Sequence, residues 1–298
     1  MLNHLISYCA DHYAKDGKCR TCTKDCLCKE TEHTCYSCIK YIHNNNTIDR
    51  HYDCPNLIYN YVIKHSYRYA SEIAYAIKYL SNFESVKHYP LWKVWSIGCG
   101  PCSEYFGLRY ATEHIRIFQN KTIDFTGFDF NHSWNDIQNF IKENLDNNLK
   151  IENKNCFEHE DAPNLIILNY MLSDLCKRST LEEVRSFMLS LSSKIQSLEN
   201  VCIIINDIDY RTFDFKQPKY ALDYMDVLAK KLATLRDAKY KYNISKHYFH
   251  PQRGTNEIYG EQYPHSNLLW VILPEAQPFD PFSICNSCQL IIVKAPRS

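Results

Sequence analysis

The sequence lacks long hydrophobic runs, and this absence excludes a membrane-spanning protein. Its longest apolar stretches cover residues 165–168, 201–205 and 268–273, whereas a transmembrane helix needs about 18 apolar residues in a row. The first nine residues contain no basic segment followed by a sustained apolar run, so we expect no secretory signal. The sequence therefore predicts a cytoplasmic protein that has no membrane partner.

The chain also has no excess of charge and very little glycine. Its 34 Lys and Arg residues balance 34 Asp and Glu residues, so no field of the whole molecule attracts nucleic acid or anionic lipid. Only seven of the 298 residues are glycine, so each glycine is expected to mark a backbone position that a side chain would disturb. The composition, 45% hydrophobic and 23% charged, is typical of a globular protein with one large domain or one with a small appendage.

Cysteine is abundant, but its number excludes a complete disulfide framework. The count of 15 is odd, and a cytoplasmic compartment keeps thiols reduced. Eight of the cysteines lie in the first 54 residues, where two Cys-x2-Cys pairs stand twelve residues apart, close to the spacing of a four-cysteine zinc site. We predict a metal-binding module over residues 1–55. Its candidate ligands are Cys19, Cys22, Cys26, Cys28, Cys35 and Cys38.

The metal content of this module stays open at the level of sequence. Zn²⁺ fits the spacing, an iron–sulfur cluster is the less favoured alternative, and buried unligated thiols are the third. The charges around these cysteines are mixed, so an RNA or protein partner is allowed but not indicated. A further pair, Cys285 and Cys288, either reaches this module, forms a separate site, or consists of two core thiols.

A helix is predicted over residues 57–82, which contain no glycine or proline. Apolar residues recur there at steps of three and four, which is typical of a helix with one buried face. His65 lies on that face and is expected to be a packed histidine, not a ligand. We interpret residues 56–90 as a helical connector.

Residues 91–107 carry the most informative pattern. Leu91–Ile97 reads as a short buried strand, residues 98–102 as a tight loop, and Ser103 as the N-cap of a helix that runs to about Ile117. A strand, a glycine loop and a helix N-terminus in this order expose backbone N–H groups to a ligand. A second strand, Ile123–Asp129, ends in a carboxylate, and an acid at that strand tip can accept both hydroxyls of a ribose.

These two segments resemble the first two motifs of class I S-adenosylmethionine-dependent methyltransferases. The resemblance rests on Val-Trp-Ser-Ile-Gly-Cys-Gly-Pro over residues 94–101 and on Gly-Phe-Asp at the end of the second strand. It implies a Rossmann-like sheet with a seventh, antiparallel strand over residues 91–298. It also implies S-adenosylmethionine as cofactor, with Asp129 on the ribose. The remaining residues that it implies for cofactor binding are Ser96, Gly98, Cys99, Gly100, Pro101 and Asn169.

Two positions depart from the pattern of the family. Ser96 stands where many members have an acid, which weakens the anchor for the ammonium group of the cofactor, and Cys102 stands where many have a third glycine. A nicotinamide-binding loop would need a glycine at Ser103, so a dehydrogenase is a poor third choice.

Strands and helices alternate in the rest of the chain, which predicts a mostly parallel sheet with helices on both faces, of the α/β class. Residues 149–157, 164–169 and 201–207 are the next strand candidates, and 240–249, 268–273 and 290–294 compete for the last two places. We favour Leu290–Lys294 as the antiparallel strand. In the family the exit of the fourth strand borders cofactor and substrate, so Asn169 and Tyr170 are the candidate catalytic residues, with Ser173 and Asp174 behind them.

The sequence thus favours a methyltransferase whose acceptor is not visible. RNA is weakly favoured, because residues 164–174 resemble the matching strand of methyltransferase-like proteins of the small mitochondrial ribosomal subunit. The alternative is a non-catalytic protein of the same fold that acts as a regulatory, assembly or toxic effector module.

Overall fold

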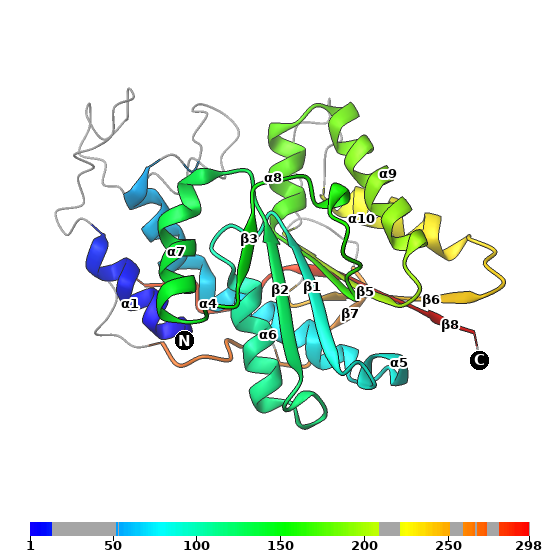
Figure 1. The fold of residues 1–298 in the computed structure, drawn as a ribbon, viewed down its shortest axis with the longest axis horizontal. Coiled ribbons are helices and arrows are strands. Elements are labelled where there is room, and N and C mark those ends of the chain that lie inside the picture. The colour runs from blue at the N-terminus through cyan, green and yellow to red at the C-terminus, as the bar shows by residue number, and fades with distance from the viewer. Residues whose placement is uncertain are drawn as a thin grey trace.

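The structure is a computed structural model that describes residues 1–13, 52, 54–208, 221–250, 259–265, 267–272 and 280–297. Its centre is an eight-stranded sheet with the order β3-β2-β1-β4-β5-β8-β6-β7 (Figure 1). The strands are β1 (Leu91–Ile97), β2 (Thr122–Phe128), β3 (Lys150–Glu152), β4 (Leu165–Asn169), β5 (Val201–Asp207), β6 (Tyr240–Tyr248), β7 (Glu261–Gln262) and β8 (Cys288–Pro296).

All strand pairs are parallel except those of β8, which runs antiparallel to both of its neighbours, β5 and β6. The predicted α/β class and the antiparallel role of Leu290–Lys294 are therefore confirmed, although the sheet has eight strands instead of seven. The extra strand is β7, a pair of residues at the edge.

The apolar run at residues 268–273 is one of the three candidates for the last strands, and its described part, residues 268–272, does not form a strand. Nearby, Asn267 makes only an isolated bridge with Ile284. The places beside β8 are taken by β5 and β6, and the other edge of β6 pairs with β7 instead of with this run.

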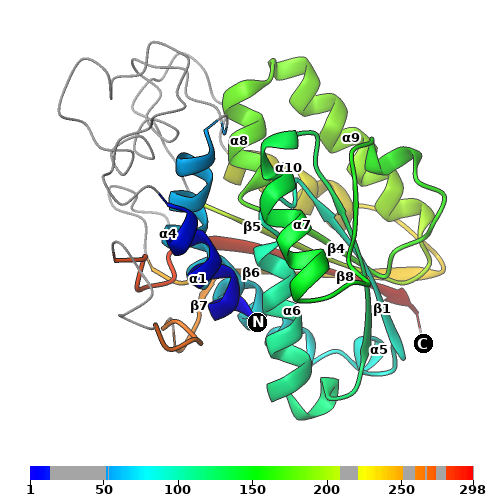
Figure 2. The same cartoon turned by 60° about the vertical axis from the view of Figure 1, so that its left-hand side comes forward.

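Helices cover both faces of the sheet. They are α1 (Leu2–His12), α4 (Pro55–Leu80), α5 (Glu84–Lys87), α6 (Ser103–His114), α7 (Asn135–Asn144), α8 (Met171–Arg178), α9 (Leu181–Ser197) and α10 (Ala221–Ala233). Two core clusters divide them, with α1, α4, α6 and α7 on one face and α8, α9 and α10 on the other (Figure 2). Successive strand residues alternate between the clusters, as Val94 and Trp95 do in β1, because neighbouring side chains on a strand point to opposite faces.

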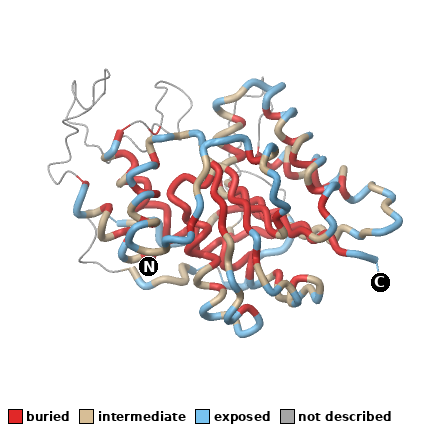
Figure 3. Tube along the Cα trace, viewed as in Figure 1, coloured by how far each residue is buried: buried red, intermediate tan, exposed pale blue. Residues whose placement is uncertain are grey.

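The long helix α4 is buried on almost all sides, and not on one face only as its periodicity predicts. Even polar residues in its middle, such as Asn60 and Glu72, are 0% exposed. The tube in Figure 3 accordingly stays red along much of this helix and through the strands beside it. His65 is packed as expected, within 3.0 Å of the Arg68 guanidinium. The reason is that α4 lies between the sheet and other helices, α6 and α1 among them, so it forms part of the core.

The N-terminal helix α1 also packs into this core. Leu2, Leu5, Ile6 and Cys9 are buried in the same cluster as α4, and the Tyr67 hydroxyl donates to Asn3 Oδ1 at 3.0 Å. The six cysteines predicted as metal ligands lie outside the described residues. Within the described ranges, no helix combines the length and the hydrophobicity that a bilayer-spanning segment requires.

Candidate active site

The loop after β1 is shaped by residues with positive φ. Gly98 has φ 68° and Gly100 has φ 46°, and a Cβ added to Gly98 would lie 2.4 Å from the Met171 Cγ atom. The N–H groups of Gly98 and Cys99 donate to the carbonyl of Phe128 at 2.8 and 3.2 Å, which joins the loop to the end of β2. Gly98 is therefore required both by its backbone conformation and by the space around it.

Helix α6 begins directly after this loop, but its N-cap is Cys102 and not Ser103. Cys102 has φ 55°, and its carbonyl accepts the N–H of Tyr105 at 3.0 Å. Ser103 is the first helical residue, and its hydroxyl donates to Ser66 Oγ on α4 at 3.2 Å. Cys102, which stands where many members of the family have a third glycine, thus adopts the left-handed conformation that a glycine would adopt easily.

Asp129 follows β2 and lies against the β1 loop. Its Oδ2 accepts the N–H of Gly100 at 2.7 Å, and its Oδ1 accepts the N–H of Asn131 at 2.8 Å. Burial raises the pKa of this carboxyl, while the two backbone donors lower it. The two strand tips that the sequence singled out, 29 residues apart, are therefore in direct contact.

The fourth strand ends beside the same loop, at Asn169. The Asn206 Nδ2 donates to Asn169 Oδ1 at 2.8 Å, and Asn169 lies close enough to Glu104 to lower the pKa of that carboxyl. The oxygen of the Asn169 side chain is consequently held by Asn206.

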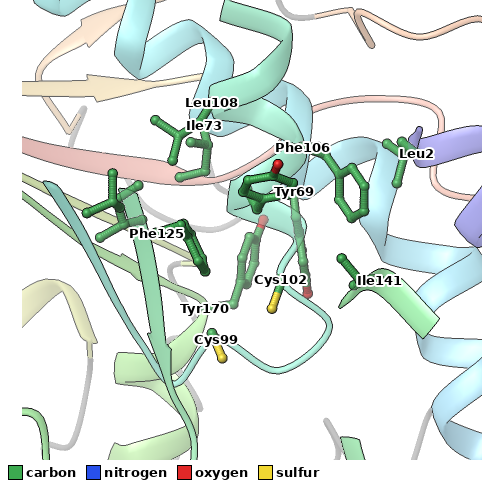
Figure 4. Close-up of a cluster of buried hydrophobic side chains, with 14 of the residues drawn as sticks. Leu2, Tyr69, Ile73, Cys99, Cys102, Phe106, Leu108, Phe125, Ile141 and Tyr170 are labelled. Atoms are coloured by element: carbon green, nitrogen blue, oxygen red, sulfur yellow. The ribbon is translucent and has the colours of Figure 1, made fainter. Parts of the chain in front are cut away.

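Tyr170 starts α8 in a left-handed conformation, with φ 57° and ψ 20°. Its N–H donates to the Asn206 carbonyl at 2.7 Å and its hydroxyl donates to Glu72 Oε2 at 3.0 Å. Its ring stacks on Tyr69 with the centroids 3.8 Å apart, and Figure 4 shows both rings beside the loop that carries Cys99 and Cys102. Burial raises the pKa of Tyr170 well above its ordinary value, so the phenol is neutral and donates its hydrogen bond.

Sequence reasoning missed Glu104, in the first turn of α6. Its carboxyl is 2% exposed, and Ser96 Oγ donates to its Oε1. Burial raises its pKa to about 7. Two features of the sequence could have indicated it: a serine at position 96, where the family often has an acid, and an acidic residue at position 104, directly after the loop.

These residues meet at one cavity of about 610 Å³ at the carboxyl ends of β1, β2 and β4. This volume lies in the range of about 300–1,000 Å³ that small-molecule sites occupy. Of the predicted residues, the lining includes Gly98, Cys99, Gly100, Pro101, Asp129, Asn169, Tyr170 and Asp174. Ser96 does not line the cavity: it is buried below the loop and reaches the site only through Glu104.

The rest of the cavity wall is largely aromatic. Tyr61 and Tyr69 come from α4, and Tyr52 lies three residues before that helix. Trp134 follows β2, and Phe157 follows β3. Phe130, directly after Asp129, is 68% exposed at this site. One wall therefore offers flat apolar surface next to the carboxyl groups of Asp129 and Glu104.

The cysteines near the end of the chain are core thiols. Cys285 and Cys288 are 0% and 1% exposed, and they belong to different hydrophobic clusters. Burial raises the pKa of Cys285 far above its ordinary value, which disfavours a thiolate ligand. In the part of the chain that the structure describes, no three His, Cys, Asp or Glu side chains are grouped as a metal site would need.

Comparisons with known proteins find structures with a similar fold, but their sequence identity to this chain is low. No family model matches the sequence, and no protein of curated function matches it. Among solved structures, a SAM dependent methyltransferase from Aquifex aeolicus has 11% identity and a TM-score of 0.42, covering 87% of this chain and 97% of that chain. Magnesium protoporphyrin IX methyltransferase from Synechocystis PCC 6803, with bound SAM, has 13% identity and a TM-score of 0.42 over 85% of this chain and 88% of that chain.

A putative RNA methyltransferase from Pyrococcus horikoshii is similar at 9% identity, with a TM-score of 0.39 over 86% of this chain and 97% of that chain. Because the identities and TM-scores are this low, the case for a function depends on the residues of the cavity itself.

Proposed function

We propose that this chain binds S-adenosylmethionine in the cavity at the ends of β1, β2 and β4 and acts as a methyltransferase. The observation that carries the proposal is the contact between the β1 loop and Asp129, where the carboxylate accepts the N–H of Gly100. This contact brings the β1 loop and an acid that can accept the hydroxyls of a ribose to one cavity.

The residues present fit the parts of this cofactor. Asp129 is held by two backbone N–H groups and keeps further lone pairs for the hydroxyls of a ribose. The aromatic residues that follow β2 and β3, Phe130 and Phe157, supply flat surface for a purine. The β1 loop and Glu104 remain for the amino-acid end. Bound there, S-adenosylmethionine would supply an electrophilic methyl group.

For the catalytic candidates, we propose a positioning role. The Tyr170 hydroxyl donates to Glu72 and its raised pKa keeps it protonated, so it is not suited to take a proton from an acceptor. Asn169 is held by Asn206 and faces Glu104. The reaction would then depend on an acceptor that is already a good nucleophile and on its alignment in a cavity shielded from water.

Binding calorimetry with S-adenosylmethionine and S-adenosylhomocysteine tests this proposal. We expect wild type to bind both, and Asp129→Ala to weaken binding by about 10- to 100-fold, because a charged acceptor of two hydrogen bonds is lost. Asp124→Ala is a matched control, since Asp124 lies on the same strand and pairs with Lys150 away from the cavity. No binding by wild type would refute the function, and binding unaffected by Asp129→Ala would refute the ribose assignment.

The acceptor is a separate proposal. RNA is favoured only by the resemblance of residues 164–174, so transfer of a labelled methyl group to total RNA and to total protein should be measured side by side. Label in neither fraction, with cofactor binding intact, would favour the non-catalytic alternative.

Within residues 1–55 we propose a zinc module. The support is the cysteine spacing alone. Elemental analysis of the purified chain should find about one or two equivalents of zinc; iron with sulfide would indicate a cluster, and no metal would refute the module.

A further inference from the structure

We propose that Glu104 is the anionic anchor of the cavity and holds the α-ammonium group at the amino-acid end of the ligand. This inference rests on the proposed function, and it assigns to α6 a role that the family gives to an acid at the position of Ser96.

The first argument is the burial of an acid on the wall of a cavity. Glu104 is 2% exposed and lines the cavity. Among the described residues, no lysine, arginine or histidine forms an ion pair with it. A buried carboxylate without a cation is costly, and a ligand that brings a cation removes that cost.

The second argument is that neighbours fix the direction of this carboxyl group. Ser96 Oγ donates to Oε1, and Asn169 at the end of β4 lies close enough to the carboxyl group to lower its pKa. Asn169 is held by Asn206, whose Oδ1 accepts Ser287 Oγ at 2.6 Å and Gln289 Nε2 at 2.8 Å. The carboxylate is thus held by Ser96 and lies beside a hydrogen-bonded network of the core, an arrangement suited to hold a bound group in one place.

The third argument is that Asp129 and Glu104 have different positions and different hydrogen-bond donors, and so suit different parts of the ligand. Asp129 follows β2 and Glu104 contacts the end of β4, and β1 lies between these two strands. Asp129 already accepts two backbone N–H groups, as an acid for hydroxyls does. The donors beside the Glu104 carboxyl are neutral, namely Ser96, its own backbone N–H and Asn169, and an ammonium group supplies the charged donor that it lacks.

The titration of Glu104 provides a signature. Burial raises its pKa to about 7, and an ammonium group beside it would lower this value, so binding should release a proton near neutral pH. The other titratable groups that face it are Asp129 after β2 and the thiols of Cys99 and Cys102 in the loop. The thiols have raised pKa values and are neutral at this pH. Asp129 is therefore the group whose charge also acts on Glu104, and its own pKa is raised by burial.

The experiment compares S-adenosylhomocysteine with its analogue that lacks only the amino group. Wild type should bind the amino compound about 10- to 100-fold more tightly than the analogue, and Glu104→Gln should bind the two within about threefold of each other. Calorimetry in buffers of different ionisation enthalpy should show about half a proton released per amino ligand at pH 7 by wild type and much less by the variant. Glu113→Gln, at an exposed position of the same helix, is the control and should behave as wild type.

The outcomes distinguish this inference from the proposed function. If wild type binds both ligands equally and releases no proton, the anchor is refuted while cofactor binding stands. If wild type binds neither ligand, both proposals fail. The comparison of the two ligands on wild type needs no substitution, so a folding defect in Glu104→Gln does not obscure the result.

Discussion

At the scale of single residues, the site is built by backbone conformations that side chains rarely adopt. Gly98, Gly100, Cys102 and Tyr170 all have positive φ, and all four lie at the ends of β1 and β4. For Tyr170 this conformation costs free energy, and its backbone bond to Asn206 and its hydroxyl bond to Glu72 hold it there. Two of the non-glycine residues with positive φ thus line or adjoin the cavity, which is typical of functional sites.

Replacing Gly98 with alanine tests this arrangement. The new Cβ would meet Met171 at 2.4 Å and the φ of 68° would be strained, so we expect a loss of about 1–3 kcal/mol in the free energy of unfolding. Urea denaturation measures it. Adding Met171→Ala to Gly98→Ala should restore the part of the lost stability that the clash causes, and leave the part that the strained backbone causes. Full restoration of stability would show that the positive φ of residue 98 costs no free energy.

At the scale of elements, the sequence predicts the positions of strands and loops better than it predicts which polar side chains are buried. Leu91–Ile97 and Val201–Asp207 were predicted with the bounds that the structure has, because each is a short, mostly apolar segment. Asp129 was found by its place after the second strand. Helix α8 is not predicted from the sequence, because a tyrosine with positive φ at its N-cap gives no signal of helix initiation.

The burial of Glu72 and Glu104 was not predicted, for a related reason. Both lie inside helices, where an acid usually faces solvent, and only the tertiary structure shows that they are buried. Glu72 illustrates this best: it accepts hydrogen bonds from Tyr170, Asn206 and the backbone N–H of Asn286, and so joins α4 to the ends of β4 and β5.

Glu72→Ala should therefore destabilise the chain strongly. Its removal leaves several buried donors without an acceptor, and we expect a loss of about 2–5 kcal/mol in the free energy of unfolding by urea denaturation. Glu84→Ala, whose side chain is 73% exposed, should change the value by less than about 0.5 kcal/mol. Equal effects of the two substitutions would show that the network around Glu72 contributes nothing measurable.

At the scale of the whole molecule, buried carboxyls should make stability depend on pH. Burial raises the pKa of Glu104 to about 7 and that of Asp207 to about 6. The folded chain then binds more protons than the unfolded chain between about pH 4 and pH 7, so the contribution of these groups is fully present below that window and is lost as the pH rises through it. His247 acts in the opposite direction, because burial lowers its pKa.

Thermal and urea unfolding of the ligand-free chain at pH 5 and pH 8 measure this dependence. Glu104→Gln should lose less stability than wild type between the two values, by up to about 1.4 kcal/mol for each pH unit over which Glu104 titrates. Parallel curves for wild type and variant would show that Glu104 is charged throughout the range.

The position of β8 has a consequence for the order in which the protein is made. Among the described strands β8 is the last in sequence, yet it lies between β5 and β6. While a ribosome is still adding residues 208–287, the edge of Val201–Asp207, an apolar run, has no partner on that side. A nascent chain therefore carries an unpaired apolar strand edge until residues 288–296 have been made, which makes this stage one at which a chaperone would protect it from aggregation.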